Sequence, residues 1–218
     1  MERENATTIS PLDFDAQALI IANGEMPAPD MLAYWAARTG YTVCCDGAAD
    51  KAAAHGIVPD AVVGDGDSLS PESREAFAPK LHLESEQETN DLTKAVRFLK
   101  ARGCTRVVIL GATGRREDHT LGNISLLLHY LRHGVTALMP TSHGVFIPCE
   151  GNVGIETEEG QEVSLFNCNA TGLKAEGLEY KCYDFDMLWQ GTLNRATSGR
   201  IKIQAEGCYI VFLANPGE

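Results

Sequence analysis

Two aspartates that lie two residues apart are the strongest candidates for chemistry in this chain. Asp65 and Asp67 follow a short apolar run in the segment Ala61-Val-Val-Gly-Asp-Gly-Asp-Ser68. Alternate residues of a strand point to the same side, so we expect the two carboxylates to converge at the tip of a strand. Converging anions repel each other unless a cation lies between them, and hard oxygen ligands suit Mg²⁺. The plainer interpretation is a solvated turn rich in Asp and Gly.

A second cluster combines glycines with basic residues in Gly111-Ala-Thr-Gly-Arg-Arg-Glu-Asp-His119. It lies between a strongly apolar run and a long helical pattern, so backbone N–H groups and the helix N-terminus can attract an anion there. Arg115 and Arg116 offer planar forks for phosphate oxygens. The cluster therefore predicts a phosphate-binding loop. The alternative is a surface charge cluster in which Asp118 is only the helix N-cap and His119 only packs locally.

Three more polar residues are candidates that carry little weight alone. Asp91 and Lys94 share one face of a predicted helix, where Lys94 is either a phosphate contact or a plain surface lysine. Asp91 in a first helical turn is favoured by the helix dipole even without a ligand. Asp46 precedes Gly47, and Asp-Gly pairs commonly form turns. These residues gain weight only from their positions relative to the predicted elements.

The first two-thirds of the chain alternates strand and helix patterns. We expect strands at 18–22, 41–45, 61–64, 106–110 and 135–139, and helices at 30–38, 48–55, 90–102, 118–132 and from about residue 72. This alternation predicts a parallel sheet with helices on both faces, whose ligand site lies beyond the carboxyl ends of the strands. Polar clusters follow four of these strands: Asn23-Gly24, Asp46-Gly47, Gly64–Ser68 and Gly111–His119. Loop solvation explains any one of them more easily than all four.

Helical periodicity ends near Pro140. Short β-type runs then follow at 144–148, 161–166, 177–182, 199–204 and 208–213, separated by turn residues. The fold class predicted is therefore α/β: an N-terminal Rossmann-like parallel-sheet domain (1–139) followed by a small C-terminal antiparallel β-sandwich domain (140–218). The boundary is expected between 136 and 143.

Composition excludes several classes of protein. The net charge of −12 disfavours a nucleic-acid partner, and no apolar run is long enough to span a bilayer. Met1–Asn5 is polar and mostly acidic, so we expect no secretory signal. Seven scattered cysteines without a Cys-x-x-Cys pair indicate reduced thiols in a cytoplasm, with neither a disulfide framework nor a zinc site. Walker, dinucleotide and nucleophile-elbow patterns are absent, which leaves magnesium-dependent phosphate chemistry.

Taken in order, the clusters resemble the thiamine pyrophosphokinase (thiamine diphosphokinase) family. The matching segments are Ala22-Asn23-Gly24, Asp46-Gly47-Ala48-Ala49, Pro59-Asp60 with Gly64–Ser68, Asn90-Asp-Leu-Thr-Lys94 and Gly111–His119. Three positions depart from the family pattern. Gly66 replaces a bulky apolar residue, and Arg115 replaces a glycine. Leu193 stands where a serine is usual near the thiamine ring, with Thr192 as a substitute.

The resemblance implies transfer of a diphosphoryl group from ATP, the co-substrate, to the hydroxyl of thiamine, giving thiamine diphosphate and AMP. It implies Mg²⁺ held by Asp65, Asp67 and Asp91, with Asp46 and Asp118 as further catalytic candidates. Candidate ATP and phosphate contacts are Asn23, Gly24, Ser68, Lys94, Gly111, Gly114, Arg115, Arg116 and His119. Candidate thiamine contacts are Asp46, Thr192, Asn194 and Trp189, although Trp189 could equally be β-domain core. A homodimer is implied, in which the thiamine site uses the β domain of the neighbouring subunit.

Two alternatives stay open. The chain could transfer a diphosphoryl group to another hydroxymethyl heterocycle, such as a pterin, because Gly66 and Leu193 depart from the family pattern. It could also be a non-catalytic protein that binds thiamine or a nucleotide. The several carboxylates argue against this second alternative, since a pure sensor has no need of so many metal ligands.

Overall fold

The computed structural model describes residues 7–217, and the acidic opening at Met1–Asn5 lies outside this range. The described residues form two compact units, one of residues 15–142 and one of residues 7–14 together with 143–217. The division between residues 142 and 143 falls inside the predicted boundary region. No helix among the described residues is long and apolar enough to cross a membrane. We call residues 15–142 the first unit and the remainder the second unit.

A parallel sheet forms the centre of the first unit. Its strand order is β7-β6-β2-β3-β4-β5, and every pair in it is parallel. The strands are β2 (Ala18–Ile21), β3 (Thr42–Cys45), β4 (Ala61–Gly64), β5 (Leu81–Leu83), β6 (Arg106–Leu110) and β7 (Thr136–Thr141). β2, β3 and β4 are buried along their whole length, which is why they are continuous apolar runs rather than alternating ones. The predicted α/β class and parallel sheet are confirmed.

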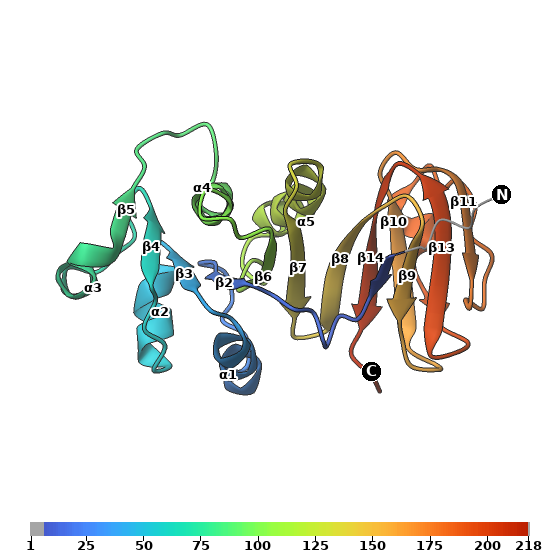
Figure 1. The fold of residues 1–218 in the computed structure, drawn as a ribbon, viewed down its shortest axis with the longest axis horizontal. Coiled ribbons are helices and arrows are strands. Elements are labelled where there is room, and N and C mark those ends of the chain that lie inside the picture. The colour runs from blue at the N-terminus through green and yellow to red at the C-terminus, as the bar shows by residue number, and fades with distance from the viewer. Residues whose placement is uncertain (1–6, 218) are drawn as a thin grey trace. The chain divides into compact units, whose positions relative to one another are not determined.

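Helices cover both faces of this sheet. They are α1 (Pro29–Arg38), α2 (Ala48–Ala54), α3 (Pro71–Ala76), α4 (Asp91–Lys100) and α5 (Glu117–Arg132), with a 3-10 turn at Ala78–Lys80. Figure 1 shows α1 and α2 on one side of the strands and α4 and α5 on the other. The Asn90 side chain accepts a hydrogen bond from the Thr93 amide and so starts α4 at Asp91.

The start of α5 differs from the sequence-based alternative for Asp118. The helix begins at Glu117 and its N-cap is Arg116, so Asp118 lies inside the first turn and is not the cap. Arg116 offers no side-chain acceptor for the first amides of the helix. The interpretation of Asp118 as an N-cap was therefore wrong, and the acidic residues of this turn instead face the positive end of the helix dipole.

The second unit contains two small sheets. Their strands are β1 (Thr7–Ile9), β8 (Gly144–Glu150), β9 (Val153–Glu156), β10 (Glu162–Asn167), β11 (Thr171–Glu176), β12 (Asn194–Arg195), β13 (Arg200–Glu206) and β14 (Cys208–Ala214). β12, β10, β14 and β8 are neighbours in one sheet, and β1, β9, β13 and β11 are neighbours in the other. All pairs within these groups are antiparallel except the pair of β1 with β9. The β-rich character of this part of the chain is confirmed.

Two expectations for this part need correction. Residues 177–182 form no strand, because β11 ends at Glu176 and only an isolated bridge between Leu178 and Ala196 follows. The predicted first domain, 1–139, also differs at its start. Residues 7–14 belong to the second unit because Thr7–Ile9 pairs with Val153–Ile155. A three-residue strand paired with a distant segment leaves no local signal in the sequence.

Candidate active site

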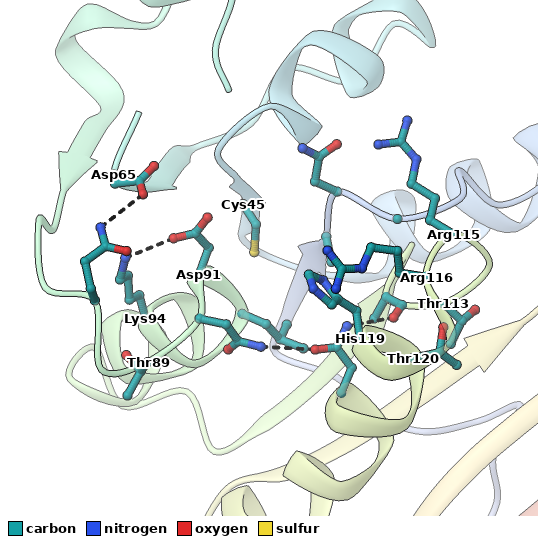
Figure 2. Close-up of a pocket in the computed structure, with 18 residues that line it drawn as sticks. Cys45, Asp65, Thr89, Asp91, Lys94, Thr113, Arg115, Arg116, His119 and Thr120 are labelled. Carbon is teal, nitrogen blue, oxygen red and sulfur yellow. Dashed lines mark hydrogen bonds and ion pairs between the residues drawn. The ribbon is translucent and has the colours of Figure 1, made fainter. Parts of the chain in front are cut away.

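A pocket of about 450 Å³ opens at the carboxyl-terminal edge of the parallel sheet. Residues that follow β2, β4 and β6 line it, together with Cys45 at the end of β3 and the first residues of α4 and α5. Figure 2 shows Asp65 and Asp91 on one side of this pocket and Arg115, Arg116 and His119 on the other. The pocket thus has walls of opposite charge, at the edge where a parallel sheet is expected to bind its ligand.

Three carboxylates gather on the acidic side. Asp46 follows β3, Asp65 follows β4 and Asp91 begins α4, and each offers a carboxylate oxygen within 4.8 Å of the others. Gly64 permits this approach, because a Cβ there would lie 2.9 Å from the Asp46 Cβ and 3.2 Å from the Asp91 Cγ. We call Asp46, Asp65 and Asp91 the acidic group. Like charges this close favour a cation between them.

Asp46 is the most unusual member of the acidic group. It is only 3% exposed and has a φ of 41°, a conformation that costs energy for any residue but glycine. Its Oδ2 accepts a hydrogen bond of 2.7 Å from the Ser68 amide. Its Oδ1 is buried and has no hydrogen-bond partner among the described residues. A buried carboxylate oxygen without a partner is costly, and coordination of a cation would remove that cost.

Asp91 pairs with a buried lysine. Lys94 is 2% exposed and its Nζ lies 3.1 Å from Asp91 Oδ1. Burial, and to a lesser degree the negative charges of Asp65 and Asp46, raise the pKa of Asp91, while Lys94 opposes this shift. The interpretation of Lys94 as a plain surface lysine was therefore wrong. Buried ammonium groups need a charged partner, and Asp91 is one.

Asp65 and Asp67 do not converge as expected. β4 ends at Gly64, so the alternation of a strand does not extend to these residues. The Asp67 amide instead donates to Asp65 Oδ1 at 3.1 Å, and this hydrogen bond is the largest cause of the lowered pKa of Asp65. Asp65 belongs to the acidic group, whereas Asp67 is exposed and lies outside it.

The opposite wall is the basic loop, by which we mean residues 111–119. Gly111 and Gly114 have φ values of 68° and 86°, which favour glycine. Arg116 donates to both carboxylate oxygens of Asp118, at 3.0 Å and 2.6 Å, and these bonds hold the pKa of Asp118 at about 2. Arg115, Arg116 and His119 line the pocket. The basic loop therefore also contains a carboxylate, that of Asp118, which is paired with Arg116.

Several residues in or beside the pocket were not proposed as site residues from the sequence. Lys51 Nζ donates to the carbonyls of Asn23 and Gly24, at 3.2 Å and 2.9 Å, and so braces the turn after β2. Asn90 entered the sequence analysis only as the start of the segment Asn90-Asp-Leu-Thr-Lys94, and Asn123 only as a residue of the predicted helix at 118–132. Gln87 Nε2 donates to Asp65 Oδ2 at 3.4 Å. These contacts join segments far apart in the chain, which local patterns do not reveal.

The candidates for thiamine contact lie in the second unit, apart from Asp46. Trp189 is 70% exposed, so its interpretation as β-domain core was wrong. Asn194 is buried, and its side chain binds both the amide and the carbonyl of Tyr180. Thr192 Oγ1 donates to the Trp189 carbonyl at 2.7 Å. Leu193 is exposed with a φ of 61°, so this turn presents an apolar side chain on a strained backbone.

Comparison with known proteins gives consistent similarities. Residues 32–139 match the family model "Thiamin pyrophosphokinase, catalytic domain", and residues 144–212 match "Thiamin pyrophosphokinase, substrate-binding domain". A thiamine pyrophosphokinase of Bacillus subtilis is 31% identical over 116 residues, which cover 51% of this chain and 54% of that protein. One of Oryza sativa is 29% identical over 53% of this chain and 52% of that protein. This chain thus matches about half the length of these curated relatives.

Solved structures share the fold over nearly the whole chain. A thiamin pyrophosphokinase from Candida albicans has a TM-score of 0.82 at 17% identity, covering 98% of this chain and 94% of that one. A thiamine pyrophosphokinase from Bacillus subtilis has a TM-score of 0.76 at 22% identity, covering 91% and 98%.

Proposed function

Because this chain belongs to the thiamin pyrophosphokinase family, we propose that it transfers a diphosphoryl group from ATP to the hydroxyl of thiamine. The products would be thiamine diphosphate and AMP. The observation that carries the proposal is the pocket in the first unit, where Asp65 and Asp91 of the acidic group lie opposite Arg115 and Arg116 of the basic loop (Figure 2). Such a pocket suits a triphosphate that is bound together with a divalent cation.

The residues present fit a magnesium ion. Asp46, Asp65 and Asp91 offer hard oxygen ligands within 4.8 Å of one another, and the buried Asp46 Oδ1 has no other partner. Asp67 remains a proposed ligand, since it follows Asp65 by two residues in the same loop. Bound Mg²⁺ would offset the negative charge that develops on the phosphate oxygens.

The chain's own residues would hold and orient the nucleotide. Lys94, Arg115 and Arg116 are proposed to bind phosphate oxygens, with Asn23, Gly24, Ser68, Gly111, Gly114 and His119 around them. Asp118 would orient Arg116 through their paired hydrogen bonds. Asp46 and Asp118 are also proposed to orient the thiamine hydroxyl. Positioning of this kind supplies much of the catalysis in phosphoryl transfer.

We propose the two units as a Rossmann-like catalytic unit that binds ATP and Mg²⁺ and a β-sandwich unit that binds thiamine. Trp189 and Thr192 remain the proposed thiamine contacts. Asn194 would act through Tyr180, because its side chain is already engaged there. A homodimer is proposed as the working form, supported by the exposed apolar side chains of Met187, Leu188, Trp189 and Leu193. A cytoplasmic location is proposed, supported by cysteines that are scattered along the chain without a Cys-x-x-Cys pair.

Product analysis tests the reaction. The protein is incubated with ATP, Mg²⁺ and thiamine, and the nucleotide and thiamine products are separated. We expect thiamine diphosphate and AMP in equal amounts. Formation of ADP would contradict the proposed bond cleavage. A parallel incubation with a hydroxymethyl pterin distinguishes the alternative substrate, and binding of thiamine without any product would indicate a sensor.

A further inference from the structure

A side-chain bridge joins the two charged walls of the pocket. Asn123, in α5, donates from Nδ2 to the carbonyl of Ala112 at 2.8 Å. Its Oδ1 accepts a hydrogen bond of 3.1 Å from Asn90 Nδ2. Ala112 belongs to the basic loop, and Asn90 is the residue directly before Asp91 of the acidic group. The side-chain amide of Asn123 therefore connects the basic loop to the residue that precedes Asp91 of the acidic group.

The direction of each amide in this bridge is set by its partners. Asn90 Oδ1 accepts from both the amide and the hydroxyl of Thr93, at 3.0 Å and 2.8 Å, so its Nδ2 must face Asn123. Asn123 then presents Oδ1 to Asn90 and Nδ2 to the Ala112 carbonyl. A carboxylate at either position would lose one of these bonds, because it has no N–H to donate.

A second contact holds α4 and α5 together without using the Asn123 side chain. The Thr93 hydroxyl and the Tyr130 hydroxyl are hydrogen-bonded at 3.0 Å, and both side chains are buried. Loss of the Asn123 side chain therefore leaves the helices packed and changes only the attachment of the basic loop to the start of α4. A variant at Asn123 is expected to fold.

We propose that Asn123 is a positioning residue that fixes the spacing between the acidic group and the basic loop. A triphosphate with its divalent cation must contact both walls at once, so a small change in their separation weakens both sets of contacts in the transition state. Asn123 acts through Asn90 and Ala112 and not by contact with the nucleotide. The inference rests on the proposed reaction, because it assigns the two walls to the same nucleotide.

The test compares the wild type with three single variants and with the double variant that combines Asn123→Ala and Asn90→Asp. Asn123→Ala removes both bonds of the bridge. Asn90→Asp keeps the helix cap, since aspartate caps as well as asparagine, but loses the donor to Asn123. Ser125→Ala, an exposed position in α5 whose hydroxyl donates only to the Gly122 carbonyl of the same helix, is the matched control. The readouts are kcat, KM for each substrate, and binding of α,β-methylene ATP with Mg²⁺ by calorimetry.

We expect Asn123→Ala and Asn90→Asp each to lower kcat by about tenfold and to weaken binding of the analogue several-fold. The reason is that a nucleotide which contacts both the acidic group and the basic loop loses contacts to each when their separation changes. Ser125→Ala should match the wild type. The double variant should lose no more than the larger single loss, since both substitutions break one bridge.

Two results would overturn the inference. Unchanged analogue binding and turnover in both single variants would show that the bridge positions nothing. Independent, additive losses in the double variant would show that Asn123 contacts the nucleotide directly. Failure of the wild type to form thiamine diphosphate would refute the proposed reaction alone, because binding of the analogue needs no thiamine.

Discussion

Asp46 combines three features, each of which costs free energy of folding. It has a positive φ without being glycine, it is buried, and one carboxylate oxygen has no partner among the described residues. The Ser68 amide holds the other oxygen. Strain of this kind persists where the surroundings enforce it, and such positions cluster at functional sites. Asp46, which the local sequence indicates only as a possible turn former and the family resemblance makes a catalytic candidate, is thus the most specific sign of a cation site.

Asp46→Asn should lower kcat by about a hundredfold or more, because the amide removes one negative charge from the acidic group and keeps an acceptor for Ser68. Steady-state kinetics over a range of Mg²⁺ concentrations measures the effect, and the Mg²⁺ needed for half-maximal rate should rise. Asp30→Asn, at an exposed position in the first turn of α1, is the control and should leave both values unchanged. Wild-type turnover in Asp46→Asn would exclude it from the cation site.

The sequence predicts Asp67 as a Mg²⁺ ligand, whereas the described structure places it outside the acidic group. A substitution at Asp67 tests this prediction. If Asp67 binds the cation, Asp67→Asn should lower turnover by at least about tenfold while the protein still folds. Circular dichroism monitors folding, and Asp65→Asn provides the comparison within the acidic group. An effect only in Asp65→Asn would restrict the metal ligands to the three clustered carboxylates.

At the scale of elements, the segment between β5 and α4 is held by hydrogen bonds to one partly exposed carboxylate, that of Glu86. Glu86 accepts hydrogen bonds from the Thr89 hydroxyl and amide and from the Glu88 amide, and pairs with Arg97 at 2.7 Å. The Thr89 hydroxyl and then Arg97 are the main causes that lower the pKa of Glu86 to about 2. This segment carries Gln87 and Asn90 to the pocket, so its order matters to the site.

The lowered pKa gives a stability effect with a defined sign. A carboxylate with a depressed folded-state pKa stabilises the fold above its unfolded pKa, near 4.5, and loses that contribution as the pH falls towards about 2. The difference in unfolding free energy between wild type and Glu86→Gln should therefore be constant at neutral pH and shrink below about pH 4.5. Urea unfolding at several pH values measures it. A difference that grows on acidification would contradict the assignment.

Two glycines test how closely the loops after β2 and β6 must approach. A Cβ at Gly24 would lie 2.4 Å from the Gly111 carbonyl oxygen and 2.6 Å from that of Thr113, whereas Gly122 in α5 has open space. Gly24→Ala should destabilise the protein by about 1–3 kcal/mol and weaken nucleotide binding, because the basic loop must move. Gly122→Ala should stabilise it by about 0.5–1 kcal/mol, as in any exposed helix interior. Equal changes in the thermal stability of Gly24→Ala and Gly122→Ala would contradict the expected difference between the two positions.

The elements that could be predicted from the sequence are those with a strong local pattern. The buried runs at 18–22, 41–45 and 106–110 became β2, β3 and β6, because strands buried on both faces are continuously apolar. β5 and β1, with three residues each, exist through pairing with distant partners and could not be read locally. For the same reason the acidic group was only partly predicted, since Asp46 joins it through the fold and Asp67 does not.

At the scale of the whole molecule, basic side chains gather at the pocket although acidic residues outnumber basic ones in the chain. The chain carries a net charge of −12, yet Lys51, Lys94, Arg115 and Arg116 all lie at or beside the pocket of the first unit. Long-range attraction does not bring a triphosphate to an acidic protein, so binding depends on this local cluster and on the cation. Composition alone could not locate the cluster.

The proposed dimer can be tested by restoring activity from two inactive variants. Asp65→Asn damages the first unit and Trp189→Ala the second, and each should be poorly active alone. If each site combines the first unit of one subunit with the second unit of its partner, a mixed dimer has one intact site. Random exchange of equal amounts should then restore about a quarter of the wild-type activity, because half of the dimers are mixed. Trp189 is 70% exposed, so its removal should not unfold the chain.

The matched control mixes Asp65→Asn with Asp46→Asn. Both lesions lie in the first unit, so a mixed dimer has no intact site and activity should not return even when subunits exchange. Sedimentation confirms that dimers form, and differently tagged copies confirm that they exchange. Exchange without any recovery in the first mixture would place the whole site within one subunit. Recovery in the first mixture alone would be explained only by a site that two copies of the chain share.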